Sequence, residues 1–247
     1  GSAETEDFKS IELAKAVGGL DLVLDGHSHV VNGGTYYGDT LLVASGYYTK
    51  NIGTVTLTVE KGEVTGESVK ILSGDTDYKE IPADPAVAKI VSDYQVKQAA
   101  LFENEIGQTQ LFWNGEKYIV RGRETALSRL ITESYLEETG ADVAFSNGGG
   151  IRSSIEPVSV SLGDVFNTQP FGNYLLTKEV KGADILSILE THFSGTSGEY
   201  LHVAGADVTY DSGKPVGERV VSCILEETGK PIDLEATYTV GTSNYIA

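Results

Sequence analysis

The chain has 247 residues, 40% of them hydrophobic, which is enough to bury one large core or two smaller ones. Its 36 acidic residues outnumber its 18 basic residues, and the formal charge of -18 repels phosphate backbones and anionic lipids, which argues against nucleic acid polymers and membrane surfaces as partners. A single cysteine excludes an internal disulfide and a thiolate metal cluster, and no apolar run has the roughly 18 to 20 residues of a membrane span.

The first 80 residues predict a small α/β unit. Residues 11–19 have the pattern of a short helix that ends at two glycines, and residues 20–26 (LDLVLDG) have the pattern of a buried strand. Between residues 40 and 72 the hydrophobic period falls to two, with Val55 and Leu57 on one face and EKGEV as a turn. This second region predicts an antiparallel hairpin.

The segment 77–85 (DYKEIPADP) carries two prolines and several charges, which makes it the best linker candidate in the chain. Pro85 fits the first turn of a helix, and apolar residues follow it at spacings of three and four over roughly 20 residues. We therefore expect a long helix that joins two domains. The expected divisions are a first domain at 1–80, a linker helix at 81–106 and a second domain at 107–247.

The last part of the chain mixes helical and strand patterns, which predicts an α+β fold. Thr125 is a candidate helix cap, Gly140 a candidate helix end, and Cys223 a candidate core residue of a strand. The expected order is a helix at 124–140, a strand at 141–147, a strand, short turn and loop at 158–173, a helix at 183–193, and then strands to the end.

Two histidines, His27 and His29, follow the first predicted strand in the motif GHSH. Gly26 lets the chain leave the strand, so both imidazoles can turn toward one point at its carboxyl end, where open α/β sheets place their ligands. Imidazole suits Zn, Mn, Fe or Co, but two ligands do not complete a metal site, and Asp25 or Asp39 are candidates to join them. The alternative is a turn with two partly exposed histidines.

A second constellation combines VRGRETALSRL with FSNGGGIRSSI. Three glycines after Asn147 allow peptide N–H groups to converge on a ligand, and Arg152 supplies a charged fork. Arg121 and Arg123 precede a predicted helix N-terminus, where the helix dipole also favours an anion. These residues predict a carboxylate or phosphate clamp, and the alternative is a glycine loop with surface ion pairs.

Two aromatic residues lie outside any periodic face: Phe171 in the loop QPFGN, and Tyr245 in SNYIA near the end of the chain. Aromatic rings held on loops can stack on a flat heterocycle, although each ring taken singly fits a packing role as well. Serine hydrolysis is disfavoured because the chain has no GxSxG nucleophile elbow.

Together the segments DLVLDGHSH, NIGTVTLTV, SNGGGIRSSI, LGDVFNTQPFGN and TYTVGTSNYIA resemble the 5′-nucleotidase family, which includes UDP-sugar hydrolases and 2′,3′-cyclic nucleotide phosphodiesterases. The resemblance covers nearly the whole chain. It implies the last third of a calcineurin-like metallophosphoesterase α/β sandwich, a linker helix, and a mixed α+β substrate-binding domain. It also implies hydrolysis of a nucleotide to a nucleoside and phosphate, and an extracytoplasmic location.

The resemblance further implies two divalent metal ions, Zn, Mn, Co or Mg, with His27 and His29 as ligands. By the same resemblance, the nucleotide would be held by Arg121, Arg152, Asn147, Gly149, Phe171, Tyr245 and Lys117. The family's earlier motifs, among them the Asn-His pair with the catalytic histidine, would lie before Gly1, and a GGDGY segment would follow Ala247. With no Met even at position 1, we expect a part of a longer protein that binds nucleotide without turnover, the alternatives being a non-catalytic binding module or a related metallophosphoesterase.

Overall fold

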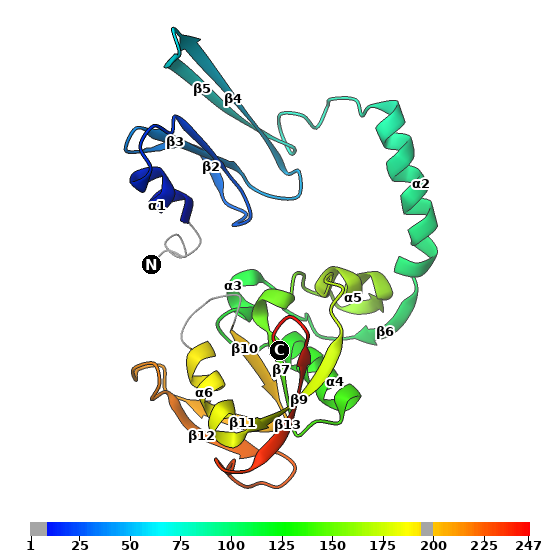
Figure 1. Ribbon diagram of the computed structural model, residues 1–247. Helices are drawn as coiled ribbons and strands as arrows, with labels where there is room; N and C mark the ends of the chain where they lie inside the picture. Colours follow the sequence, from blue (N-terminus) through cyan, green and yellow to red (C-terminus); the bar gives the residue numbers. More distant parts are fainter. Residues whose placement is uncertain (1–8, 194–199) are drawn as a thin grey trace. The chain divides into compact units, whose positions relative to one another are not determined.

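The computed structural model describes residues 9–193 and 200–247, which form two compact units, residues 1–90 and 91–247 (Figure 1). The division falls inside the helix α2, Pro85–Phe102. Among the described residues, no helix combines the length and the apolar character that a membrane crossing needs.

The described part of the first unit contains the helix α1, a three-stranded sheet, a separate hairpin and the start of α2. Its elements are α1 (Lys9–Ala16), β1 (Leu22–Asp25), β2 (Val31–Tyr37), β3 (Thr40–Ser45), β4 (Asn51–Glu60) and β5 (Glu63–Ser73). The sheet has the order β1-β3-β2, with β1 parallel and β2 antiparallel to β3, and β4 pairs with β5 along its whole length. The expected helix, strand and hairpin are therefore present.

The expected burial of the first strand is wrong. Leu24 of β1 is 70% exposed, whereas Leu42 of β3 is completely buried. The reason is position in the sheet, because among the described residues β1 is hydrogen-bonded to β3 alone, whereas β3 lies between two strands. An apolar run alone does not distinguish an edge strand from a central one.

The helix α2 begins where the sequence predicts. Asp84 caps it, since one of its carboxylate oxygens accepts hydrogen bonds from the backbone N–H groups of Ala86 at 2.9 Å and Val87 at 3.0 Å. Its apolar residues, among them Ile90 and Tyr94, lie exposed in this structure. The helix is therefore held by its N-terminal cap and its backbone bonds, and its predicted apolar face has little cover here.

The second unit is built around a four-stranded mixed sheet of order β10-β7-β13-β9. Its strands are β7 (Val143–Asn147), β9 (Leu175–Lys181), β10 (Leu201–Ala204) and β13 (Thr237–Ser243). Two ribbons accompany it: β6 (Glu105–Thr109) with β8 (Val158–Ser161), and β11 (Ala206–Tyr210) with β12 (Val220–Leu225). The helices are α3 (Lys117–Val120), α4 (Ala126–Thr139), α5 (Leu162–Thr168) and α6 (Gly182–His192), with a 3₁₀ turn at Gly148–Gly150.

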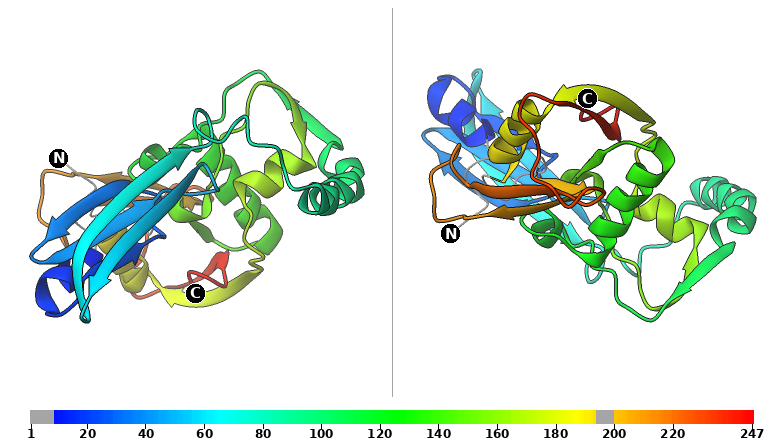
Figure 2. Two further views of the ribbon diagram at one scale, coloured as in Figure 1. Left: turned by 90° about the horizontal axis from the view of Figure 1, so that it is seen from above. Right: turned by 90° about the horizontal axis from the view of Figure 1, so that it is seen from below.

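The two faces of this sheet differ in chemistry because side chains alternate along each strand. Phe145 of β7 and Val203 of β10 are paired and belong to the apolar cluster that contains Ile185 of α6. On the other face Ser146 pairs with His202 and lies 2.6 Å, oxygen to oxygen, from Thr132 of α4. The helices α6 and α4 lie on opposite sides of these strands (Figure 2).

The segment 158–173 contains more helix than the sequence predicted. Residues expected to form a short turn instead form α5, and Ser161 and Asp164 make reciprocal side-chain bonds to each other's backbone N–H groups at its start. This reciprocal pair is a capping box that uses Asp in place of the usual Glu, which is why the pattern was missed.

Cys223 lies buried on β12 as expected, and burial raises the pKa of its thiol.

Candidate nucleotide-binding site

One edge of the four-stranded sheet gathers most of the residues singled out in the second unit. The strands β7 and β13 are parallel and end at this edge, and β9 and β10 run antiparallel to them and begin there. The glycine turn follows β7, the loop with Phe171 precedes β9, and Tyr245 follows β13. The connectivity thus brings segments from residues 147, 171 and 245 to the same edge.

The glycine turn packs directly on the end of α3. A Cβ atom at Gly148 would lie 2.1 Å from the Val120 carbonyl oxygen and 3.2 Å from the Arg121 Cα atom, so only glycine fits there. The Gly148 N–H donates to the Tyr200 carbonyl at 2.8 Å. Asn147 is the last residue of β7 and half-buried, and Arg121 follows α3 directly. The backbones that carry Arg121 and Asn147 are therefore in contact.

A second backbone contact fixes the segment that carries Lys117. A Cβ atom at Gly115 would lie 2.2 Å from the Ser153 carbonyl oxygen, and the Gly115 N–H donates to the Ser154 hydroxyl at 2.9 Å. Lys117 is the first residue of α3, half-buried, with its ammonium 5.5 Å from the centre of the Tyr118 ring. The start of α3 is therefore held against the segment that begins at Arg152.

Arg152 joins the glycine turn to an aromatic ring. One guanidinium nitrogen, Nη1, donates to the Gly149 carbonyl at 3.3 Å, and the guanidinium carbon lies 5.8 Å from the centre of the Phe171 ring. The Arg152 backbone N–H donates to the Thr168 carbonyl at 2.9 Å. A guanidinium held over a ring can still offer its other N–H groups to an anion.

Both aromatic loops leave exposed rings beside paired strands. Phe171 is 52% exposed and Tyr245 is 69% exposed. The loops are tied together by Asn244, whose backbone N–H donates to the Tyr174 carbonyl at 3.0 Å and whose side-chain oxygen accepts from the Tyr174 N–H at 2.9 Å. These bonds extend the β9–β13 pairing. They hold the loops that carry Phe171 and Tyr245 next to each other where these two strands meet.

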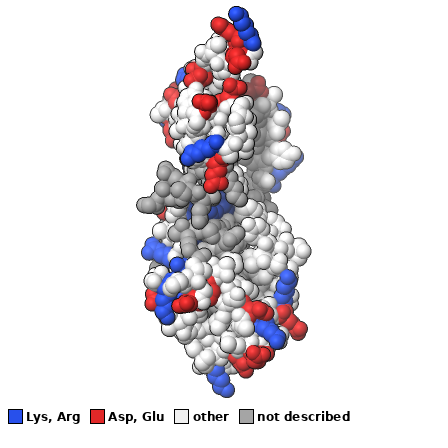
Figure 3. Space-filling view, turned by 60° about the vertical axis from the view of Figure 1, so that its left-hand side comes forward, with Lys and Arg blue, Asp and Glu red and all other residues white. Residues whose placement is uncertain are grey.

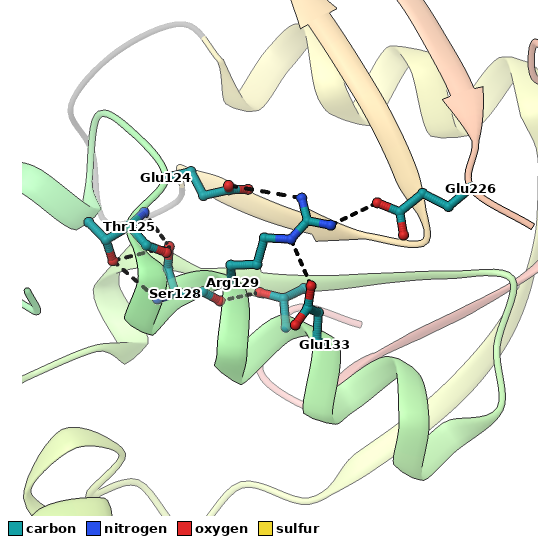
Figure 4. A network of polar contacts seen from close by, with 7 residues as sticks. Glu124, Thr125, Ser128, Arg129, Glu133 and Glu226 are labelled. Atoms are coloured by element: carbon teal, nitrogen blue, oxygen red, sulfur yellow. Dashed lines mark hydrogen bonds and ion pairs between the residues drawn. The ribbon is translucent and has the colours of Figure 1, made fainter. Parts of the chain in front are cut away.

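The remaining arginines of the second unit serve other purposes. Arg129 on α4 bonds Glu133 at 2.7 Å and Glu226 at 2.8 Å and lies 4.0 Å from Glu124 (Figure 4), and these contacts raise its pKa, chiefly the bond to Glu133. Arg219 donates to the Phe193 and Lys214 carbonyls. Of the two candidates before α4, Arg123 is exposed and Arg121 is half-buried.

Acidic residues outnumber basic residues over the chain as a whole, 36 to 18. Figure 3 shows one face of the molecule, on which acidic side chains are widely spread and basic side chains lie among them. A nucleic acid backbone binds to a continuous basic surface, which that face does not offer.

Sequence reasoning missed His202, which lies beneath the glycine turn. It is 2% exposed, its Nε2 atom is 2.9 Å from the Val120 carbonyl oxygen, and burial lowers its pKa to about 4. Its Nδ1 atom is buried and has no hydrogen-bond partner among the described residues. The partner Val120 is 82 residues away in sequence, so no local motif announces the contact.

The two histidines of the first unit lie in a turn at the carboxyl end of β1. Both have left-handed backbone angles, with φ of 67° at His27 and 65° at His29, which is uncommon for residues with a side chain. His27 is exposed. The His29 ring stacks on Tyr47 with 4.5 Å between ring centres and 9° between planes. Tyr47 follows β3, which is parallel to β1, so both turns share one edge.

The histidine turn offers imidazole donors for a metal ion but no complete site. No group of three or more His, Cys, Asp or Glu side chains in the described part of the chain could hold an ion. Asp25 uses one oxygen to accept from the Gly26 N–H at 2.8 Å, and its other oxygen is buried without a partner in that part of the chain. Asp39 precedes β3, at the opposite end of the sheet, so the idea that it completes the site is wrong.

Comparison with known proteins now decides the family. The profile described as "5′-nucleotidase, C-terminal domain" matches residues 105–247. The chain belongs to the 5′-nucleotidase family. Its mixed α/β content with small sheets agrees with the expected fold class. The sheet edge that carries Arg152 and Phe171 lies wholly inside the matched 5′-nucleotidase region.

The relatives of this chain include a trifunctional nucleotide phosphoesterase. It is 30% identical to the trifunctional nucleotide phosphoesterase protein YfkN of Bacillus subtilis, over 96% of this chain and 17% of that protein. It is also 30% identical to protein UshA of Yersinia enterocolitica, over 76% of this chain and 32% of that protein. The chain therefore spans less than a third of the length of these two curated relatives.

Solved structures agree at the level of the fold. The crystal structure of a 5′-nucleotidase precursor from Thermus thermophilus matches with a TM-score of 0.77 at 30% identity, over 96% of this chain and 52% of that chain. A sulfate thiohydrolase SoxB, also from Thermus thermophilus, matches with a TM-score of 0.67 at 19% identity, over 95% of this chain and 44% of that chain. This second likeness shows the shared fold alone.

Proposed function

We propose that residues 91–247 bind a nucleotide and that the whole protein hydrolyses its phosphate ester, releasing a nucleoside and phosphate. The observation that carries the proposal is the contact of Arg152 with both Gly149 and the exposed ring of Phe171. This contact places a cation beside a flat apolar surface, which matches a ligand made of an anionic group joined to a heterocycle.

In the proposed complex the base stacks between Phe171 and Tyr245, whose loops leave the same sheet edge. Arg121 and Arg152 bind the phosphate oxygens, and Lys117 adds charge from the start of α3. Asn147 and Gly149 contribute polar groups of the glycine turn. The negative charge of the rest of the chain makes this local concentration of cations necessary, since the mean field opposes an anion.

The first unit would supply His27 and His29 as ligands of two divalent ions, Zn, Mn, Co or Mg. Both imidazoles are compatible with such ions, and Asp25, whose buried second oxygen has no partner among the described residues, lies on the strand that leads to them. When bound, such ions activate water and neutralise charge on the phosphoryl group. The turn orients His29 through its stacking on Tyr47. We also propose an extracytoplasmic location, on the resemblance to the family.

The rival class is a module that binds nucleotides or nucleosides without catalysis. The two classes differ in the coding sequence before Gly1, where an Asp-x-His motif and an Asn-His pair are expected for the enzyme. Their absence there would favour the binding module. A UDP-sugar hydrolase or a 2′,3′-cyclic nucleotide phosphodiesterase would share the site, and a panel of these substrates separates them from a 5′-nucleotidase.

Calorimetric titration of the chain with AMP and adenosine tests the proposal directly. Phe171→Ala is expected to weaken the binding of both ligands by about tenfold or more, because stacking on an aromatic ring contributes ~1–3 kcal/mol per base. Phe166→Ala is the matched control, since Phe166 is 47% exposed, close to the value for Phe171, but its ring stacks on Phe102 of α2. Wild-type protein that binds neither ligand, or equal losses in both variants, would contradict the assignment.

A further inference from the structure

His202 is the one buried histidine in the described part of the second unit. Its hydrogen-bond partner determines which ring nitrogen carries the proton. The Val120 carbonyl can only accept a hydrogen bond, so His202 Nε2, 2.9 Å away, must carry the proton and donate. The ring is therefore the Nε2–H tautomer. Its strand, β10, packs against α4 and presents His202 on the same face as Ser146, which contacts Thr132 of α4.

The same carbonyl is a contact point for the glycine turn. Gly148 packs against the Val120 oxygen and the Arg121 Cα atom, and its N–H donates to the Tyr200 carbonyl at 2.8 Å. Tyr200 precedes His202 by two residues. One short segment, 200–202, thus bonds both the end of α3 through His202 and the glycine turn through Tyr200.

We propose that His202 is a positioning residue for the anion-binding part of the site. It holds the Val120 carbonyl by its Nε2–H group and so sets the backbone direction from which Arg121 leaves α3. The inference rests on the proposed function, because it assumes that Arg121 binds the phosphate. It assigns His202 no contact with the nucleotide.

A histidine that merely fills the core would give different results from a positioning residue. Loss of a core contact lowers the melting temperature and leaves relative ligand affinities unchanged. Loss of the Val120 bond shifts Arg121, so it weakens AMP, which carries the phosphate, more than adenosine, which does not. The ratio of the two affinities therefore separates the two roles.

Two amides of similar polarity provide the matched variants. In His202→Gln the side-chain amide nitrogen reaches about as far as Nε2 and can donate to Val120, whereas in His202→Asn the amide nitrogen falls at the level of Nδ1 and cannot. We expect His202→Gln to bind AMP within about twofold of wild type. We expect His202→Asn to lose about tenfold in AMP affinity, with adenosine changed by less than about twofold.

A double-mutant cycle tests whether the effect passes through Arg121. In an Arg121→Ala background, His202→Asn is expected to cause no further loss of AMP affinity, because the group it positions is gone. His202→Leu removes the donor without burying a new polar group, and it takes the place of His202→Asn where the latter does not fold.

The outcomes separate the two proposals. Wild-type protein that binds no AMP overturns the proposed function and this inference with it. Wild-type protein that binds AMP, together with a folded His202→Asn or His202→Leu variant whose AMP-to-adenosine affinity ratio equals that of wild type, overturns the positioning role alone. A ratio lowered about tenfold in those variants and restored in His202→Gln supports it.

Discussion

At the scale of single residues, His202 links stability to pH. Burial lowers its pKa to about 4 in the folded chain, against about 6.5 when unfolded. The pKa of His202 is lower in the folded chain than in the unfolded chain. The stability that the neutral ring provides is therefore fully present above pH 6.5 and is lost as the pH falls toward 4. The linkage amounts to about 2 kcal/mol between pH 7 and pH 5.

Urea denaturation at pH 7 and pH 5 measures this effect against a non-titrating control. The free energy of unfolding of wild type is expected to fall by about 2 kcal/mol more than that of His202→Gln over this range. The carboxylates titrate in both proteins, so their contribution cancels in the difference. Parallel pH profiles for the two proteins would show that His202 does not titrate as its burial requires.

Gly148 carries a second prediction at this scale. In Gly148→Ala the new Cβ atom would lie 2.1 Å from the Val120 carbonyl oxygen. The oxygen is a backbone atom and the Cβ position is fixed by the backbone, so the turn or the end of α3 must move. We expect a loss of roughly 3 kcal/mol in stability and weaker AMP binding. Thermal and urea denaturation measure the first effect, and calorimetry the second.

Gly107→Ala is the control for that substitution, because a Cβ atom at Gly107 meets no atom within 4 Å. Its stability is expected to stay within about 0.5 kcal/mol of wild type. Similar losses in the two alanine variants would mean that the close packing of Gly148 on Val120 has no special energetic role.

The sequence could indicate Arg152 and Phe171 because a run of glycines and an aromatic residue in a loop are recognisable as candidate ligand contacts without knowledge of the tertiary structure. It could not indicate their mutual contact, which depends on the return of the chain through α5 to Thr168. His202 was invisible for a related reason. In the mostly apolar segment YLHVAGA it occupies an ordinary strand position, and its importance comes from a carbonyl supplied by a distant helix.

At the scale of elements, the start of α4 tests whether a local capping motif determines where a helix begins. Thr125 accepts from the Ser128 N–H at 3.1 Å, and Ser128 accepts from the Thr125 N–H at 2.8 Å. Thr125→Ala is expected to cost about 1 kcal/mol, the usual value of an N-cap. Ser187→Ala, an exposed position inside α6, is the control and is expected to be neutral in thermal denaturation. A neutral Thr125→Ala would show that tertiary packing alone starts α4 at this point.

Elements with strong end signals were predictable, and elements defined by their neighbours were not. The long helix α2 and the capped helix α4 appear where proline, aspartate, threonine and glycine mark their ends. The helix α5 was missed because its capping box uses Asp164. The edge position of β1 was missed because strand order depends on pairing between residues far apart in sequence.

At the scale of the whole molecule, the two units carry different parts of the proposed chemistry. All proposed nucleotide-binding residues lie between positions 117 and 245, and both proposed metal ligands lie in the first unit. Sequence motifs assigned these roles to separate regions, but only a complete set of ligands makes a metal centre. The described residues contain no such set.

This separation predicts that nucleotide binding by the chain does not depend on metal. With excess EDTA, AMP affinity is expected to stay within about twofold of its value without chelator. His27→Ala with His29→Ala should leave that affinity equally unchanged, since the substitutions lie outside the unit that holds the ligand.

With Mn²⁺ or Zn²⁺ added, the chain is expected to release no phosphate from AMP, because two imidazoles do not complete the metal centre that activates water. Calorimetry and a phosphate-release assay measure the two quantities on one preparation. Metal-dependent turnover by the chain would contradict this division, because it would require a complete metal centre within these 247 residues.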